Sequence, residues 1–170
     1  MTHGQDHCCP ELDKALWNEK SHLWRDKPFI RGSIPALFHT PFPPMVGKLV
    51  GRMWQMAKDA GAAPEMKDFL LLAYDPTPFK SEFFMTVTKE VPGAENFKLS
   101  GTFVSKVFDG PYRAVPRWVR ELDVYLRSQG QAAGKYYFYF TYCPKCAKSY
   151  GHNYCVAFAQ VTSMDGKQDN

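Results

Sequence analysis

Two cysteines near the carboxyl-terminal end of the chain have the spacing of a metal-binding pair. Cys143 and Cys146 form a C-x2-C motif, and His152 and Cys155 extend it to C-x2-C-x5-H-x2-C. Two thiolates at this spacing can reach one ion, so Cys143, Cys146 and His152 are candidate zinc ligands. The second half of the motif has abnormal spacing for zinc, and alternation places Cys155 inside a strand.

The same cysteines permit other interpretations. A complete zinc site can instead recruit ligands from the amino-terminal segment, where the candidates are His7, Cys8 and Cys9. A redox pair is the rival, because C-x-x-C lowers a thiol pKa when its first cysteine begins a helix. We expect this motif to lie in a hairpin, which removes that support. Unmetallated loop thiols are the remaining alternative.

A second group of candidate residues lies on two aromatic segments, EFFMTVT (82–88) and KYYFYFTY (135–142). Side chains alternate between the two faces of a strand. In the first segment, Glu82, Phe84 and Thr86 therefore share one face. The other face is apolar and suits packing against helices: Phe83, Met85 and Val87.

The second aromatic segment divides in the same way. Phe138 and Phe140 match Leu70 and Leu72 of an earlier strand, and we expect all four to pack on helices. The residues that then face away from the helices are Tyr137, Tyr139 and Thr141. Two tyrosines, Phe84 and Glu82 on one open face suit an aromatic pocket with a few polar anchors, although a solvated sheet face is the plainer alternative.

The elements that must position these residues occur in the same order twice. Hydrophobic periodicity predicts a strand over 29–40, a helix over 43–60 and strands over 69–74 and 82–88. The second copy has a strand over 98–109, a helix over 115–128 and strands over 135–142 and 153–161. The corners before the two helices align at an offset of 70 residues, since Phe38 matches Phe108 and Pro41 matches Pro111.

The predicted fold class is therefore α+β, a tandem βαββ repeat. We expect one domain over 29–163, with repeat one at 29–90 and repeat two at 97–161. Residues 1–28 are predicted to be a tail and a short helix over 11–24, and residues 164–170 a polar tail. A chain of 170 residues has room for one core of this kind.

The corner KVFDGPYRAVPRWVREL (106–122) resembles the second strand-to-helix corner of the GyrI-like small-molecule-binding superfamily. That superfamily includes the effector domains of MerR-type multidrug regulators, and the SOUL haem-binding proteins have a similar plan. The ending CPKCAKSYGHNY is similar to that of bacterial members catalogued as hydrolases. The resemblance covers about 29–161.

The resemblance implies two repeats around a pseudo-twofold axis, with helices on one side of an antiparallel sheet and a ligand cleft on the other. Tyr112, at the corner, can either pack at the start of the helix or direct its hydroxyl into that cleft. Trp118 can form the floor of the cleft, although a core position is the favoured interpretation for this residue. Many relatives carry a Glu in the strand equivalent to 135–142. This chain has none there, so Glu82 is the candidate acid, and neutral aromatic ligands are favoured over cations.

Three functions fit these residues. The first is binding of a small aromatic or hydrophobic molecule, for sensing, sequestration or detoxification. The second is a hydrolase or lyase acting on an activated molecule, with Glu82 as general base and Tyr137 or Tyr139 as hydrogen-bond donor. The third is a zinc-stapled interaction domain, with zinc as the only cofactor considered.

The composition limits the class of protein and the compartment that can be expected. Hydrophobic residues, with Cys and Met included, make up 45% of the chain, which excludes a disordered protein. A net charge of +4 without a continuous basic stripe gives no reason to expect nucleic-acid binding. Five cysteines, an odd number, favour a reducing, cytoplasmic compartment, and no apolar run is long enough to span a membrane. The oligomeric state cannot be read from the sequence.

Overall fold

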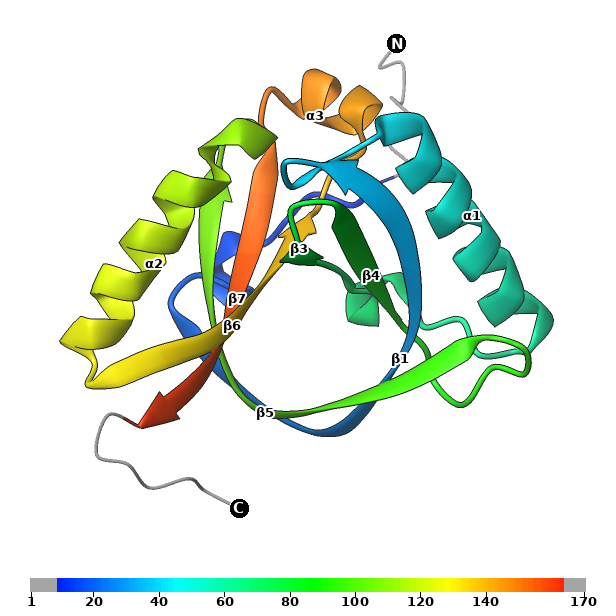
Figure 1. The fold of residues 1–170 in the computed structure, drawn as a ribbon, viewed down its shortest axis with the longest axis horizontal. Coiled ribbons are helices and arrows are strands. Elements are labelled where there is room, and N and C mark those ends of the chain that lie inside the picture. The colour runs from blue at the N-terminus through cyan, green and yellow to red at the C-terminus, as the bar shows by residue number, and fades with distance from the viewer. Residues whose placement is uncertain (1–8, 164–170) are drawn as a thin grey trace, which may run out of the picture. The chain divides into compact units, whose positions relative to one another are not determined.

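The structure is a computed structural model that describes residues 9–163. These residues form seven strands and three α-helices, which confirms the predicted α+β class (Figure 1). In chain order the elements are β1 (Lys20–Leu37), β2 (Thr40–Pro41), α1 (Pro43–Asp59), β3 (Leu71–Thr77), β4 (Lys80–Thr86), β5 (Glu95–Asp109), α2 (Val115–Ser128), β6 (Gln131–Phe140), α3 (Pro144–Tyr150) and β7 (Tyr154–Ser163).

The predicted order of strand, helix, strand, strand occurs twice, as β1-α1-β3-β4 and as β5-α2-β6-β7. The chain divides into two compact units. The described part of unit 1 comprises residues 9–22, 104–136 and 140–163. Unit 2 comprises residues 23–103 together with 137–139, so the central part of β6 belongs with the first copy.

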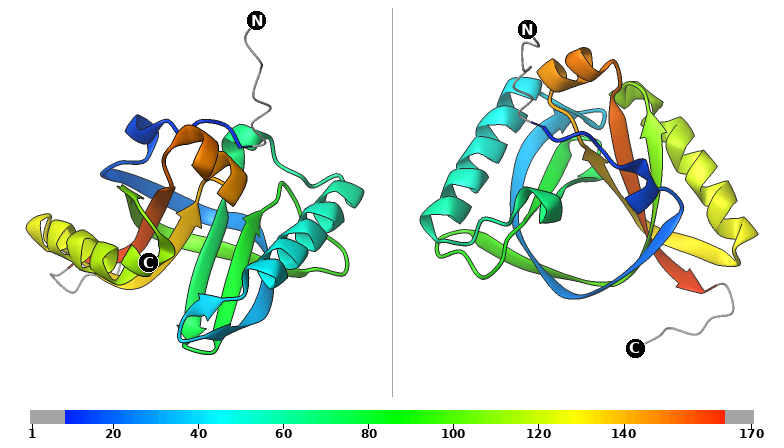
Figure 2. Two further views of the ribbon diagram at one scale, coloured as in Figure 1. Left: turned by 90° about the horizontal axis from the view of Figure 1, so that it is seen from above. Right: turned by 180° about the vertical axis from the view of Figure 1, so that it is seen from behind.

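Unit 2 is an antiparallel sheet with α1 on one face. Its strands lie in the order β2-β1-β4-β3, and Phe138 of β6 pairs with Ala73 of β3. Two prolines begin α1, where their missing N–H groups leave no hydrogen bond unmade. The buried stripe of α1, Leu49, Met53 and Ala57, packs on the sheet side chains Ile30, Ile34, Phe83, Met85 and Val87, and α1 runs beside β1 (Figures 1 and 2).

One face assignment of the sequence analysis is wrong. Leu71 and Ala73, rather than Leu70 and Leu72, pack with the core beneath α1. The reason is the pairing register, in which Leu71 lies opposite Met85 and Ala73 opposite Phe83. Directly paired residues share a face, so β3 presents its odd-numbered side chains to the helix.

Unit 1 contains β7 together with the part of β5 from residue 104 on and the parts of β6 outside 137–139. The three strands neighbour one another in the order β6-β7-β5, and α2 packs against β7. Trp118, Leu122 and Leu126 form the buried stripe of α2. The Trp118 ring stacks on Phe108 at 5.4 Å and lies 6.1 Å from the ring of Phe140. This contact confirms that Phe140 packs on a helix.

Among residues 9–163, none of the helices combines the length and the apolar character that crossing a bilayer requires.

The predicted amino-terminal helix over 11–24 is wrong. The structure has only a single 3-10 turn there, Lys14–Leu16, and the chain is already a strand from Lys20. The apolar residues that suggested a helix, such as Trp17 and Trp24, instead contact the sheet side chains Phe158 and Phe103. The predicted tails over 1–8 and 164–170 lie outside the described residues.

Gly32 of β1 lies close to side chains of α1. A Cβ atom at this position would lie 2.6 Å from Leu49 Cδ1 and 3.0 Å from Met53 Sδ. We expect Gly32→Ala to lower the free energy of unfolding by about 1–3 kcal/mol, because an added methyl group overpacks this contact. Urea denaturation measures the change.

Gly47→Ala is the matched control, since a Cβ at Gly47 of α1 meets nothing within 4 Å. We expect it to be neutral or to stabilise the protein by about 0.5–1 kcal/mol, because Ala favours the helix over Gly. Equal stability of the Gly32→Ala variant and the wild type would contradict the packing described for α1.

Candidate functional site

The sheet of unit 2 has a second face, turned away from α1, that brings together aromatic and charged side chains. In the ladder between β1 and β4, Arg31 lies opposite Phe84, and in the ladder between β3 and β4, Tyr74 lies opposite Glu82. Paired residues share a face, so these four side chains project from the same side of the sheet. Phe84 is buried, and Glu82 is 8% exposed.

Five rings on this side define what we call the aromatic face: Tyr74, Phe84, Phe97, Phe103 and Tyr137. The Tyr137 ring contacts three of them, with centroid distances of 5.4 Å to Tyr74, 5.8 Å to Phe84 and 6.2 Å to Phe103. Phe84 also meets Phe97 edge-on at 5.4 Å. Edge-to-face and tilted contacts of this kind stabilise an aromatic cluster beyond the area that it buries.

Two cations and two carboxylates border the aromatic face. Arg31 Nη1 lies 3.8 Å from Glu82 Oε2, and Lys80 Nζ lies 3.5 Å from Glu82 Oε1. Arg31 also donates a hydrogen bond to Glu95, and its guanidinium lies 5.3 Å from the Phe97 ring centroid. The hydrogen bond from Arg31 lowers the pKa of Glu95 below its usual value, so Glu95 stays charged.

Tyr137 is the buried polar group of the aromatic face. Its side chain is 3% exposed, and burial is the main reason that the pKa of its phenol rises to about 12. The neighbouring Tyr74 and the Glu82 carboxylate raise this pKa further, because a negative charge nearby opposes ionisation of the phenol. Tyr137 therefore remains a protonated hydrogen-bond donor throughout the physiological pH range.

This shift predicts a pH dependence of stability. Between pH 10 and about 12 the unfolded protein loses the Tyr137 proton while the folded protein keeps it. Folding stability is then lost as pH rises through this window, by up to about 2.7 kcal/mol at 1.36 kcal/mol per pKa unit. We expect Tyr137→Phe to lose less stability than the wild type across the window in urea denaturation.

Tyr125→Phe is the control for general alkaline effects, because Tyr125 is a half-buried tyrosine on α2 in unit 1, outside the aromatic face. Comparing the stability that the two variants lose between pH 10 and 12 isolates the contribution of Tyr137. If Tyr137→Phe and the wild type lose equal stability over that window, the phenol does not have the raised pKa.

The structure places only part of the predicted site on the aromatic face. Glu82, Phe84 and Tyr137 come together there. The buried Thr86 hydroxyl instead accepts a hydrogen bond from the Leu70 amide at 2.9 Å, which gives it a structural role. The Tyr139 ring meets Phe69 at 6.3 Å, next to Trp54 of α1.

The other three predicted ligand-binding residues belong to unit 1. Trp118 is 1% exposed and forms part of the core beneath α2. The Tyr112 ring lies 5.4 Å from the Phe140 ring. Thr141 donates a hydrogen bond from its hydroxyl to the Tyr154 carbonyl at 2.9 Å. Packing and backbone contacts account for the positions of all three.

Sequence reasoning missed Arg31, Phe97 and Tyr74. Alternation along β1 was a usable signal for Arg31, because the apolar residues Ile30 and Ile34 share one face of the strand and Arg31 lies on the other. Tyr74 follows from the corrected register of β3. Phe97 lies on β5, and no short-range pattern shows that this residue meets Phe84.

Two serines lie near histidines, but neither geometry produces a nucleophile. Ser81 donates its proton to Asp75 Oδ1 at 2.6 Å, and His39 Nδ1 lies 3.7 Å from the other oxygen of that carboxylate. Ser105 is fully buried, forms a 2.7 Å hydrogen bond with His22 and donates to the Trp17 carbonyl at 2.6 Å. A nucleophilic serine requires a hydroxyl proton directed to a base and access to substrate.

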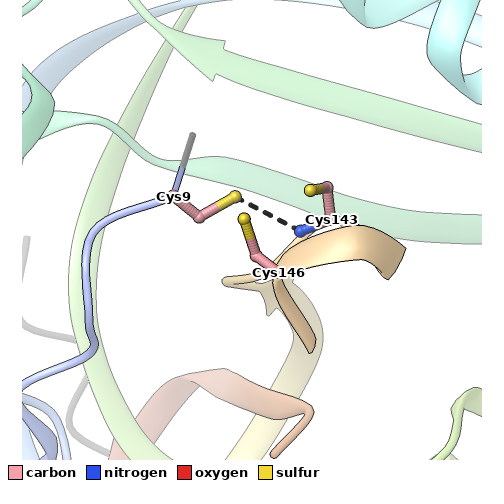
Figure 3. Close-up of side chains that lie close together, drawn as sticks. All are labelled: Cys9, Cys143 and Cys146. Carbon is pink, nitrogen blue, oxygen red and sulfur yellow. Dashed lines mark hydrogen bonds between the residues drawn. The ribbon is translucent and has the colours of Figure 1, made fainter. Parts of the chain in front are cut away.

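The cysteine motif has a different setting from the one predicted. It lies at the start of the short helix α3, with Cys143 preceding Pro144, so the predicted hairpin is wrong. The sulfurs of Cys143 and Cys146 lie close to Cys9 (Figure 3). His152 is not in this group of ligand atoms, and its Nδ1 forms a 2.8 Å hydrogen bond with Asp109 instead. His7 and Cys8 lie outside the described residues.

Known structures share this fold. The C-terminal domain of EcmrR superimposes with a TM-score of 0.66 at 12% sequence identity, covering 87% of this chain and 99% of that chain. An uncharacterized conserved protein from Listeria innocua has a TM-score of 0.62 at 8% identity, covering 85% and 92%. A hydrolase from Listeria innocua has a TM-score of 0.59 at 8% identity, with the same coverage.

At these identities the superpositions show a common fold, in agreement with the GyrI-like plan that the sequence resembles. No protein with a curated description matches the sequence. The sequence profile of a family described as bacterial hydrolase matches residues 1–161, nearly the whole chain. The chain therefore belongs to this bacterial hydrolase family.

Proposed function

We propose that the aromatic face of unit 2 binds a small apolar or aromatic molecule and that Glu82 activates water to hydrolyse it. The observation that carries this proposal is a nearly buried carboxylate beside a buried, protonated phenol among aromatic rings. Small-molecule sites are mostly apolar and contain a few polar groups that orient the ligand. Membership of the bacterial hydrolase family, and the fold shared with a hydrolase from Listeria innocua, support the same activity.

The proposed step uses no covalent enzyme intermediate. Glu82 accepts a proton from water as the water oxygen forms a bond to an electrophilic carbon of the substrate. Tyr137 donates a hydrogen bond to the substrate atom on which negative charge develops. The bond between the attacked carbon and the leaving oxygen then breaks, and the proton held by Glu82 passes to that oxygen, which is the alkoxy oxygen of an ester or lactone or the ring oxygen of an epoxide. The substrate must be activated, because water is a weak nucleophile.

Binding without turnover is the second candidate. Each carboxylate oxygen of Glu82 faces a cation, Oε2 toward Arg31 and Oε1 toward Lys80. A carboxylate held between two cations can serve to keep these charged side chains in place beside the aromatic rings. In that case the protein would sequester or sense its ligand.

Incubation with small hydrophobic esters, lactones and epoxides in oxygen-18 water distinguishes the candidates. For a hydrolase we expect a product that carries one solvent oxygen, formed faster than in protein-free buffer and detected by mass spectrometry. Compounds that bind, detected by a rise in Tm, but yield no labelled product would favour sequestration. If no compound binds or reacts, both candidates fail.

A further inference from the structure

We propose that Cys9, Cys143 and Cys146 bind a zinc ion in unit 1. The three sulfur atoms all lie within 4.8 Å of one another. Zinc holds thiolates at about 2.3 Å in a tetrahedron, which places two sulfurs about 3.8 Å apart. Side-chain adjustments of about 1 Å therefore bring these sulfurs to bonding distance of one ion. Figure 3 shows the Cys9 sulfur directed toward Cys146 and the backbone nitrogen of Cys143.

Two of the ligands are positioned by the start of α3. Cys143 immediately precedes the helix, and Cys146 lies in its first turn. Residues three apart are neighbours on a helical surface, so the C-x2-C spacing directs both sulfurs to one side. Cys146 is 1% exposed, whereas Cys143 and Cys9 are half-buried. The site is therefore buried on the side of Cys146 and accessible to solvent and to an ion on the side of Cys143 and Cys9.

Cys9 comes from the other end of the chain and is held by hydrogen bonds. The Cys143 backbone amide donates to the Cys9 sulfur at 3.3 Å, and the Tyr150 hydroxyl donates to the Cys9 carbonyl at 2.8 Å. The Leu12 amide donates to the Tyr142 hydroxyl at 2.9 Å. These contacts place the third ligand before any ion binds, and the amide donor stabilises a negative charge on the Cys9 sulfur.

The ligand set selects the type of metal. Three sulfur ligands suit soft or borderline ions such as zinc, whereas magnesium and calcium require oxygen ligands. Each coordinating thiol releases its proton to solvent as the metal–sulfur bond forms. The three sulfurs leave one tetrahedral position for water or a further ligand.

A zinc ion at this position links the amino-terminal segment to α3, across 134 to 137 positions of sequence. The role is structural, because the ligands come from two segments that the ion joins. It is independent of the proposed hydrolysis, whose residues all lie in unit 2. Zinc can therefore be absent from this site without any change in the assignment of Glu82.

Cobalt substitution tests the proposal on the whole chain. Reduced, metal-free protein is titrated with Co²⁺, and thiolate coordination is read from the sulfur-to-cobalt charge-transfer band in the near ultraviolet. We expect saturation at one ion per chain and displacement of cobalt by zinc. Cys9→Ser, Cys143→Ser and Cys146→Ser should each weaken binding by about 100-fold or more, because each removes a metal ligand.

Cys155→Ala is the matched control, since Cys155 is buried in β7 and is not part of the cluster. It should retain the band and the stoichiometry. Circular dichroism reports whether each variant folds. Hydrogen exchange of the wild type supplies a second test, because zinc should slow exchange of the Leu12 amide and a chelator should restore it. Absence of the band in the reduced wild type, or a band unaffected by Cys9→Ser, would overturn the proposal.

Discussion

Glu82→Gln is expected to lower kcat by about 10²–10⁴-fold on any substrate that the wild type hydrolyses, because the amide cannot accept a proton from water. The substitution keeps the size of the side chain, so the sheet and the rings around it should remain in place. The ion pairs with Arg31 and Lys80 are lost, which lowers stability modestly. Substrate binding should change much less than kcat. Steady-state kinetics together with ligand affinity separates the two effects.

Glu121→Gln provides the matched control on the surface of α2. Glu121 is half exposed and pairs with Arg117 at 3.5 Å within the helix, a contact of small energetic value. Its kcat should equal that of the wild type. If Glu82→Gln keeps full activity, the carboxylate is not the base and the proposed mechanism is wrong. The proposal that the aromatic face binds a ligand would not be affected by that result.

Phe84→Ala is expected to lower the free energy of unfolding by about 3–5 kcal/mol. The Phe84 ring is 3% exposed and lies at the centre of the aromatic face, where it contacts Phe29, Phe97 and Tyr137. Its removal leaves a cavity that strand residues can fill only in part. Urea denaturation measures the loss. The variant should also lose affinity for small aromatic ligands.

Phe79→Ala is the control for this substitution, because Phe79 is 60% exposed on the turn between β3 and β4. It should change stability by less than about 0.5 kcal/mol and leave ligand affinity unchanged. A small effect of Phe84→Ala on stability would contradict the packing of the aromatic face. A destabilised but folded Phe84→Ala protein with wild-type ligand affinity would contradict its role in binding.

The repeat order and the helices were predictable because they depend on local patterns. The apolar stripe of α2, with Trp118, Leu122 and Leu126 buried, recurs at the helical period. The faces of β4 were also correct, since Phe83 and Met85 alternate with Glu82 and Phe84. A single strand with strict alternation needs no knowledge of its partners.

Pairing register and long-range contacts were not predictable from the same patterns. FLLLAY is apolar on both faces, so alternation alone does not show whether Leu71 or Leu72 faces α1, and only pairing with β4 decides it. Phe97 contacts Phe84 because of the path that β5 follows in the fold, which no local pattern shows. The segment over 11–24 looked helical because its apolar residues recur at a helical spacing, but their partners lie on strands.

The candidate sites were likewise predictable where they depend on local patterns and unpredictable where they depend on long-range contacts. Glu82 and Tyr137 were identified from alternation on two separate strands, and the structure brings them together. Cys9 was one alternative among three amino-terminal residues, and hydrogen bonds to α3 and to Tyr150 single it out. His152 matched a ligand spacing but hydrogen-bonds Asp109, which sequence spacing cannot reveal.

Locating a bound molecule on the protein tests the central claim most directly. Protein with isotope-labelled phenylalanine and tyrosine rings is titrated with small neutral aromatic molecules and with any substrate from the hydrolysis screen, and ring signals are followed by NMR. Ligand contacts with the rings of Phe84 and Tyr137, abolished together with binding in Phe84→Ala, are the predicted result. Contacts confined to exposed rings such as Phe38 and Phe79, with Phe84 and Tyr137 unperturbed, would contradict it.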